Sequence, residues 1–247
     1  MPKLVILRHG ESTWNLENRF TGWVDVDLNA RGEEEARLAG ELIAKEQDLV
    51  VDTVHTSVLT RAVRTADISL SAAGRSFIPV HRHWRLNERH YGALQGLNKK
   101  ETADRYGPEQ VHAWRRGYDT PPDPVSMDNP NHPANDPRYA LVPRSALPAT
   151  ECLADVVKRM VPYYEDAIAP ELLEGKNVLV VAHGNSLRAL RMYLENMSGE
   201  EVADLEIPTG VPRVYDLGPN LEFRSAQDLG DPEAIRLAAD AVRRQAG

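Results

Sequence analysis

The sequence predicts an α/β fold of three layers, in which helices flank a central and mostly parallel sheet. Short apolar segments alternate along the chain with longer segments of helical periodicity. This alternation is typical of parallel sheets, because each parallel connection needs a crossover that is usually a helix. Two of the apolar segments, Leu4–Leu7 and Val178–Ala182, are continuous, as in strands that are buried on both faces.

The first half of the chain begins with a strand at Leu4–Leu7. Asn29 can cap a helix that runs to about Gln47, and the acidic residues at 33–35 suit the positive end of its dipole. The apolar positions of this segment follow helical spacing. Three further elements are expected here in the order strand, helix and strand: Val50–His55, Ser57–Leu70 and Ile78–Val80.

The second half opens with a long helical segment, Thr150–Leu173, which Pro162 should kink or interrupt. The strand Val178–Ala182 is followed at once by a helix from about Ser186 to Asn196. The remaining expected elements are a short helix opened by the capping box Ser198–Glu201, a hairpin of Val211–Leu217 and Leu221–Arg224, and a C-terminal helix that begins at Asp231-Pro232.

One segment departs from this pattern. Residues 119–148 contain 8 of the 17 prolines and little periodicity. Because strong elements continue after it, we interpret it as an ordered or semi-ordered surface excursion of one domain that spans residues 1–247. A disordered insert is the alternative that the composition leaves open.

The composition is that of an ordinary globular protein, with 42% hydrophobic and 27% charged residues among 247. The net charge of −8 argues against broad binding to nucleic acid or anionic membranes, although it allows a small basic pocket. The one cysteine, Cys152, excludes an internal disulfide and fits a reducing compartment. No segment reaches the roughly 20 apolar residues of a membrane span, and the N-terminal apolar run is too short for a signal peptide. We therefore expect a cytoplasmic protein.

Two distant segments repeat one pattern, in which a buried strand runs directly into His-Gly-x-Ser. The first contains His9 and Gly10, and the second contains His183 and Gly184. Ligands of parallel α/β sheets bind beyond the carboxyl ends of the strands, so both imidazoles should lie on the same rim. The glycines let backbone amides approach an anion closely. A metal site is less favoured, because Arg8 places a positive charge beside His9.

Histidines beside arginines suit chemistry on phosphoryl groups. A neutral imidazole is a nucleophile that is poised near pH 7, and arginine matches phosphate oxygens bidentately. Candidate cations are Arg61, which follows an expected strand, together with Lys99, Arg115 and Arg116. The alternative for an isolated arginine on a helix is a solvated charge. Glu88 is the candidate proton donor, and a surface salt bridge to Arg89 is the competing interpretation.

These motifs resemble those of a known family across nearly the whole chain. The segments that carry the resemblance are Arg8–Ser12, Asn15, Arg19–Trp23, Thr56–Leu59 with Arg61-Ala62, Leu86–Lys99, Trp114–Gly117, Ala182–Arg188 and Ile207–Pro212. The sequence is similar to the cofactor-dependent phosphoglycerate mutases of the histidine phosphatase superfamily. Arg-His-Gly alone would indicate only the superfamily, whereas Leu86–Lys99 points to the mutase branch. The resemblance implies the histidine phosphatase fold.

The resemblance also implies a role for each matching residue. His9 would become phosphohistidine, and Glu88 would donate and accept the proton. The clamp on the transferring phosphoryl group would consist of Arg8, Arg61 and His183, with help from Asn15 and Gly184. The binders of the substrate carboxylate and second phosphate would be Thr21, Gly22, Tyr91, Lys99, Arg115, Arg116 and Asn185.

The implied reaction interconverts 3-phosphoglycerate and 2-phosphoglycerate, as in glycolysis and gluconeogenesis. The implied cofactor is 2,3-bisphosphoglycerate, which primes His9, and no metal is expected. Water must be kept from the phosphohistidine, so we expect a movable cover formed by the C-terminal segment after about residue 228 or by residues 119–148. The expected partners are small phosphoglycerates and further copies of the chain in a dimer or tetramer, without nucleic acid or membrane.

Two alternatives use the same residues. A histidine-dependent phosphatase that acts on sugar phosphates or phosphoproteins would need His9, Arg8, Arg61, Glu88 and His183. It would have no need for the cations at 99, 115 and 116, so these favour the mutase. A non-catalytic anion-binding module could keep the arginines, but it would tolerate the loss of both His9 and Glu88.

Overall fold

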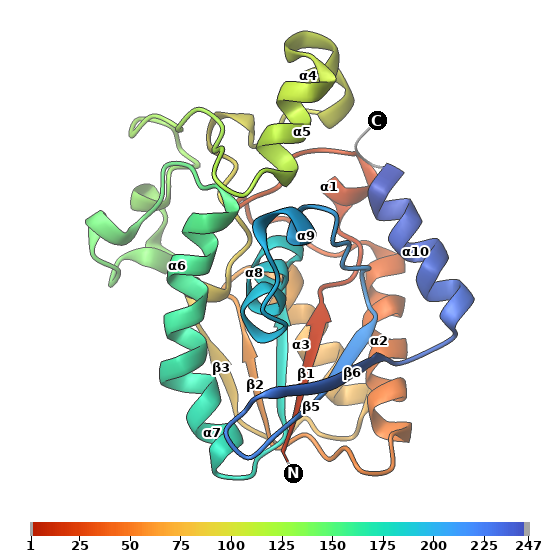
Figure 1. Cartoon of the computed structure of the whole chain (residues 1–247). Helices are drawn as coiled ribbons and strands as arrows, with labels where there is room; N and C mark the ends of the chain where they lie inside the picture. The colour runs from red at the N-terminus through yellow and green to blue at the C-terminus, as the bar shows by residue number, and fades with distance from the viewer. Residues whose placement is uncertain (1, 245–247) are drawn as a thin grey trace.

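A computed structural model of the chain describes residues 2–244, so the expected domain ends at Met1 and at 245–247 lie outside the described residues. One six-stranded sheet runs through its centre in the order β3-β2-β4-β1-β5-β6 (Figure 1). The strands are β1 (Lys3–Arg8), β2 (Thr53–Thr56), β3 (Val80–Arg82), β4 (Val178–Ala182), β5 (Pro212–Leu217) and β6 (Phe223–Asp228). The first four are parallel to one another, whereas β5 is antiparallel to β1 and to β6. The expected mostly parallel sheet is confirmed.

Helices cover both faces of the sheet, as expected (Figure 1). The helices of one layer are α2 (Ala30–Lys45) and α3 (Thr60–Ala72). Those of the other are α6 (Leu153–Tyr163), α7 (Ala169–Leu173) and α8 (Gly184–Leu194), and the C-terminal helix is α10 (Pro232–Arg244). Asn29 caps α2, since its side chain accepts a hydrogen bond from the Gly32 amide at 2.9 Å.

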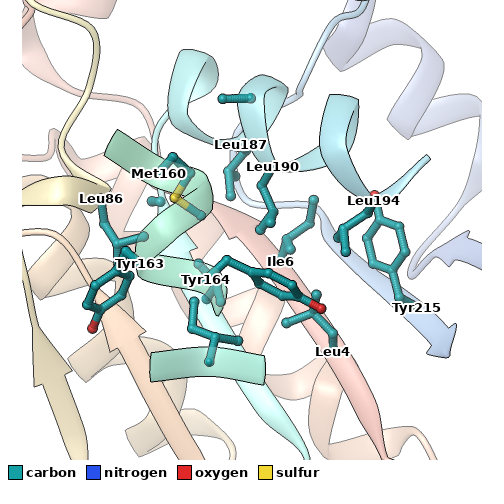
Figure 2. Close-up of a cluster of buried hydrophobic side chains, with 14 of the residues drawn as sticks. Leu4, Ile6, Leu86, Met160, Tyr163, Tyr164, Leu187, Leu190, Leu194 and Tyr215 are labelled. Carbon is teal, nitrogen blue, oxygen red and sulfur yellow. The ribbon is translucent and has the colours of Figure 1, made fainter. Parts of the chain in front are cut away.

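The alternation of side chains along β1 explains why the core has two halves. Leu4 and Ile6 belong to the cluster under α6 and α8, whereas Val5 and Leu7 belong to the cluster under α2 and α3. Figure 2 shows the first cluster, with Leu187 and Leu190 of α8 directed at β1. Each fully buried side chain of this kind contributes roughly 1.5–3 kcal/mol of apolar burial. The continuous apolar runs thus form the middle layer.

Several expected elements shift at their ends for identifiable reasons. The strand expected at Val50–His55 begins only at Thr53, because residues 50 and 52 bond to Asn177 outside the ladder. The strand expected at Ile78–Val80 lies at Val80–Arg82. The strand begins after Pro79 because Pro79 has no amide hydrogen to donate to the ladder. Its carbonyl still accepts a hydrogen bond from the Val54 amide.

Two helices also start elsewhere than expected, and one long helix is divided. The helix expected from Ser57 begins at Thr60, and the helix expected from Ser186 begins at Gly184 because His183 occupies its N-cap. The segment Thr150–Leu173 separates into α6, a π-helical turn at residues 164–168 and α7. Pro162 lies inside α6 just before that turn, where its missing amide interrupts the regular ladder.

Four short helices lie toward the upper end of the molecule as drawn in Figure 1, and only one of them was expected from the sequence. The unpredicted ones are α1 (Thr13–Leu16), α4 (Lys99–Tyr106) and α5 (Pro108–Arg116), and the expected one is α9 (Gly199–Ala203). Gly107 separates α4 from α5 with a φ of 88°, a conformation that glycine adopts without strain. Residues 119–148 contain only three short 3-10 turns. Among the described residues, no helix is both long and apolar enough to cross a bilayer.

Candidate active site

The two histidines of the repeated motif meet at the carboxyl ends of adjacent parallel strands. Arg8 at the end of β1 lies in register with Ala182 at the end of β4, and the His9 amide donates to the Ala182 carbonyl at 3.0 Å. The ring centroids of His9 and His183 are 5.0 Å apart. The fold therefore brings together imidazoles that are separated by 174 positions in the sequence.

Hydrogen bonding assigns the tautomer of His9. Its Nδ1 lies 2.7 Å from the Gly10 carbonyl, which can only accept, so Nδ1 carries the proton. Burial lowers the pKa of His9 well below its usual value, and the charges of Arg61 and Arg8 lower it further. The imidazole is therefore neutral at pH 7, and its Nε2 accepts a hydrogen bond from Arg61 Nε at 3.3 Å.

His183 lies behind His9 and is fully buried. Its Nε2 shares a hydrogen bond of 2.7 Å with the hydroxyl of Ser57, which directly follows β2. Burial, followed by the charge of Arg61 and the proximity of His9, lowers the pKa of His183 well below its usual value. Its Nδ1 has no hydrogen-bond partner among the described residues, and His183 is not among the residues that line the cavity beside His9.

A small cavity of about 80 Å³ opens beside His9. It is lined by nearly all of the residues singled out from the sequence: Arg8, His9, Asn15, Thr21, Gly22, Arg61, Glu88, Tyr91, Lys99, Arg115, Arg116, Gly184 and Asn185. Its further lining residues, which were not assigned to the site from the sequence, are Arg19, Phe20, Arg188, Glu206, Ile207 and Val242.

Backbone carbonyls hold the two arginines nearest to the histidines. Arg61 donates to the carbonyls of Gly22 at 2.8 Å and Val24 at 3.1 Å, and Arg8 donates to the Ile207 carbonyl at 2.7 Å. Burial lowers the pKa of Arg61 to about 10, which still leaves the guanidinium charged at pH 7. A carbonyl fixes a guanidinium without cancelling its charge, so both cations remain available to an anion.

The side chain of Glu88 lines the same cavity. Its Oε1 accepts from the amides of Asn185 at 3.0 Å and Arg89 at 2.8 Å. A Cβ on Gly184 would lie in ordinary contact with Glu88 Oε2 at 3.6 Å and with the Arg8 guanidinium at 3.7 Å, so Gly184 lies next to both groups. Glu88 is thus a pocket carboxylate rather than the surface partner of Arg89 that the competing interpretation required.

A buried ion pair supports the backbone around Glu88. Arg159 donates to the carbonyls of Arg85, Asn87 and Glu88 and also pairs with both oxygens of Glu151. Glu151 in turn accepts from the His90 amide at 2.8 Å. The pair therefore fixes the chain on both sides of Glu88. Neither residue stands in a recognisable motif, so the pair was not predicted from the sequence.

A second cationic group lies in the cavity beyond the histidines and comes from helices that the sequence analysis did not predict. Lys99 is the first residue of α4, and Arg115 and Arg116 close α5. Burial, followed by the charge of Arg115, lowers the pKa of Lys99 to about 7. Within α8, the side-chain oxygen of Asn185 accepts a hydrogen bond from Arg188 at 3.0 Å, and both residues line the cavity. Arg188 follows Asn185 at helical i+3 spacing, a signal that could have revealed it.

The arrangement suits nucleophilic chemistry on a ligand that carries two anionic groups. A neutral imidazole faces a cluster of fixed cations, and a carboxylate stands within the same cavity. Among residues 2–244, no group of three or more histidine, cysteine or acidic side chains is arranged to hold a metal ion.

Comparison with known proteins places this fold and site in a family. The family model of the histidine phosphatase superfamily (branch 1) matches residues 4–131 and 126–219, so the chain belongs to this superfamily. A curated 2,3-bisphosphoglycerate-dependent phosphoglycerate mutase of Thermobifida fusca (strain YX) is 56% identical over 246 residues, which cover 99% of both chains. The chain belongs to the family of this relative, and the resemblance to the mutases that the sequence indicated is confirmed.

Solved structures agree on the fold. A mycobacterial glucosyl-3-phosphoglycerate phosphatase superposes with a TM-score of 0.69 at 24% identity, covering 92% of this chain and 97% of the other. The α-ribazole phosphatase of Shigella flexneri gives a TM-score of 0.65 at 23% identity, covering 93% and 96%. At this level of identity the likeness concerns the fold alone.

Proposed function

We propose that this protein is a 2,3-bisphosphoglycerate-dependent phosphoglycerate mutase, which interconverts 3-phosphoglycerate and 2-phosphoglycerate through a phosphohistidine. The observation that carries the proposal is the second cationic group, Lys99, Arg115 and Arg116, in the same cavity as the neutral His9. A mutase must hold a ligand with two phosphates at once, whereas a simple phosphatase needs to hold one. The identity of 56% to a curated mutase supports the same conclusion.

In this proposal His9 Nε2 accepts the phosphoryl group and the bond from phosphorus to the departing oxygen breaks. Arg8 and Arg61 balance the charge that develops on the phosphoryl oxygens, and His183 and Asn15 complete the clamp with the Gly184 backbone. Glu88 gives its proton to the departing oxygen. In the reverse direction Glu88 removes the proton from the attacking hydroxyl as His9 releases the phosphoryl group.

The residues present fit the proposed cofactor, 2,3-bisphosphoglycerate. Arg8 lines the cavity, and its buried Nε has no partner in the described part of the chain, which suits an anionic ligand. When bound, the cofactor supplies the phosphoryl group that primes His9. Thr21, Gly22 and Tyr91 would hold the carboxylate and distal phosphate together with Asn185 and the second cationic group.

The proposal includes a cover over the site. Val242 of α10 lines the cavity, which supports the C-terminal segment after about residue 228 as part of a lid. In residues 119–148, the Tyr139 hydroxyl accepts from the Asn87 amide at 2.8 Å, beside Glu88. Both segments therefore lie close enough to the site to contribute to a cover. Excluding water would preserve the phosphohistidine from hydrolysis.

A coupled assay that converts 3-phosphoglycerate to 2-phosphoglycerate, with and without added 2,3-bisphosphoglycerate, tests the function. We expect turnover to depend on the additive, and acid-labile phosphate to appear on His9 after brief exposure to it. Release of inorganic phosphate without isomerisation would instead establish the phosphatase. Mutase-level turnover that survives both Arg115→Ala and Arg116→Ala would also contradict the proposal, and inhibition by EDTA would contradict metal independence.

Two finer expectations stay predictions. We expect the protein to act in the cytoplasm, with which its single cysteine is compatible, and to form a dimer or tetramer. Analytical ultracentrifugation at micromolar concentration would measure the oligomeric state, and a monomer would contradict that expectation.

A further inference from the structure

Glu206 is an acid in a cavity that is otherwise suited to anions. Among the described lining residues, seven cationic side chains accompany two carboxylates, those of Glu88 and Glu206. Glu88 has a role in the proposed proton transfer. Glu206 has none, and its negative charge repels any anion that enters the cavity. Its presence therefore requires a different explanation.

The carboxylate of Glu206 holds Arg116 of the second cationic group. Its Oε1 accepts a hydrogen bond from Arg116 Nη2, and the two side chains are only 7% and 12% exposed. Because both side chains are so little exposed, dissolved salt screens their interaction only weakly. Glu206 therefore partly neutralises the charge of Arg116 whenever no ligand is bound.

This differs from the way in which the fold holds Arg8 and Arg61. Those two guanidiniums are fixed by carbonyls, which orient a cation without neutralising it. The segment 206–207 contains both kinds of partner, because the Ile207 carbonyl holds Arg8 while the neighbouring Glu206 carboxylate holds Arg116.

We propose that Glu206 is an internal competitor for the ligand, which neutralises Arg116 in the empty cavity and limits the affinity for anions that carry two phosphates. An arriving phosphate must share Arg116 with the carboxylate. The ligand is bound less tightly than the cations alone would bind it, and it leaves faster. The inference rests on the cavity being an anion site and holds whichever phosphorylated metabolite is the substrate.

A purely positioning role for Glu206 would reverse the sign of the effect. If Glu206 only positioned Arg116, removal of its charge would misplace the guanidinium and weaken binding. If it competes, removal of its charge tightens binding. The direction of the change in dissociation constant therefore separates the two roles.

The test measures binding by calorimetry in a His9→Gln background, which prevents turnover, with two probes: 2,3-bisphosphoglycerate and inorganic pyrophosphate. We expect Glu206→Gln to lower both dissociation constants about tenfold, the equivalent of 1.4 kcal/mol. The matched control is Glu195→Gln, which breaks a similarly buried pair with Arg191 outside the cavity and should leave both constants unchanged. Unchanged or weaker binding in Glu206→Gln would overturn the proposal.

A double-variant cycle tests the route through Arg116. In an Arg116→Gln background the gain from Glu206→Gln should shrink to less than about threefold, because the two side chains no longer interact. An equal gain in both backgrounds would overturn the claim that Glu206 acts by occupying Arg116. In the otherwise wild-type enzyme, Glu206→Gln should lower KM without raising kcat.

Two further arms keep the result interpretable. Thermal unfolding verifies that each variant is folded, and Glu206→Ala replaces Glu206→Gln if the latter is not. The pyrophosphate arm does not depend on mutase activity. Tighter pyrophosphate binding in a protein that fails the mutase assay would leave this inference standing while the proposed function fails.

Discussion

The guanidinium of Arg61 stands 3.3 Å from His9, with its Nε directed at the Nε2 lone pair. Two carbonyls hold the other guanidinium nitrogens, so this cation cannot withdraw when a phosphoryl group arrives. The nucleophile and its electrostatic partner are therefore assembled before the ligand binds, which is how enzymes avoid reorganisation during the reaction.

Arg61→Lys should lower kcat by about 10²–10³-fold, because lysine keeps the charge but not the bonds to the Gly22 and Val24 carbonyls. Quench-flow measurement of acid-labile phosphate on His9 follows the step directly. Arg64→Lys is the control one turn further along α3, where an exposed arginine pairs with Asp27 and Glu33 and should matter little. Equal effects in the two variants would refute a special role for Arg61.

Glu151→Gln should both destabilise the protein and slow catalysis. It leaves Arg159 buried with its charge uncompensated, which costs about 3–5 kcal/mol in the free energy of unfolding. The backbone around Glu88 loosens as a result, so kcat should fall and its pH profile should shift, while KM changes less. Urea unfolding and pH–rate profiles measure the two effects.

Lys158→Ala serves as the control, because it removes an exposed pair with Asp155 on the same helix, α6, and should cost less than about 1 kcal/mol. An unaltered pH–rate profile in folded Glu151→Gln would show that the pair supports stability alone.

Lys99 should make anion binding depend on pH above neutrality. Its pKa in the empty cavity is lowered to about 7, and a bound phosphate favours the charged ammonium. Binding therefore takes up a proton when the pH exceeds about 7, and affinity should fall by up to about tenfold per pH unit from there toward pH 9. Calorimetry in buffers of different ionisation enthalpy measures the uptake.

Lys99→Arg stays charged throughout that range and should abolish the pH dependence. The same proton uptake in wild type and Lys99→Arg would assign the titration to another group.

Removal of the residues after Asp228 should raise the ratio of phosphatase to mutase activity. The truncation takes away α10 and with it Val242, which lines the cavity. Water would then reach the phosphohistidine more often. Parallel assays of phosphate release and isomerisation measure the ratio, and an unchanged ratio in a folded truncation would exclude a lid role for this segment.

Much of the fold follows from local sequence. The apolar runs of β1 and β4 predict buried strands, because burial on both faces requires continuous hydrophobicity. The His-Gly motif at the end of each run then places His9 and His183 on one rim. The caps at Asn29 and Ser198 likewise mark helix starts through a short-range hydrogen bond.

Other features depended on contacts that local patterns do not encode. The helices α4 and α5 were not predicted, because they are short and polar. The strand β2 begins late because residues 50 and 52 bond to Asn177, and β3 begins after Pro79, which has no amide hydrogen.

The sequence by itself determined the layered fold, the pair of histidines and the positive residues suited to phosphate, since these depend on periodicity and on the chemistry of short motifs. Only the tertiary structure decided that Arg159 and Glu151 support Glu88, that Glu206 occupies Arg116, and that Val242 reaches the cavity. These relationships join residues through the path of the whole chain. Local propensity carries no information about such distant partners.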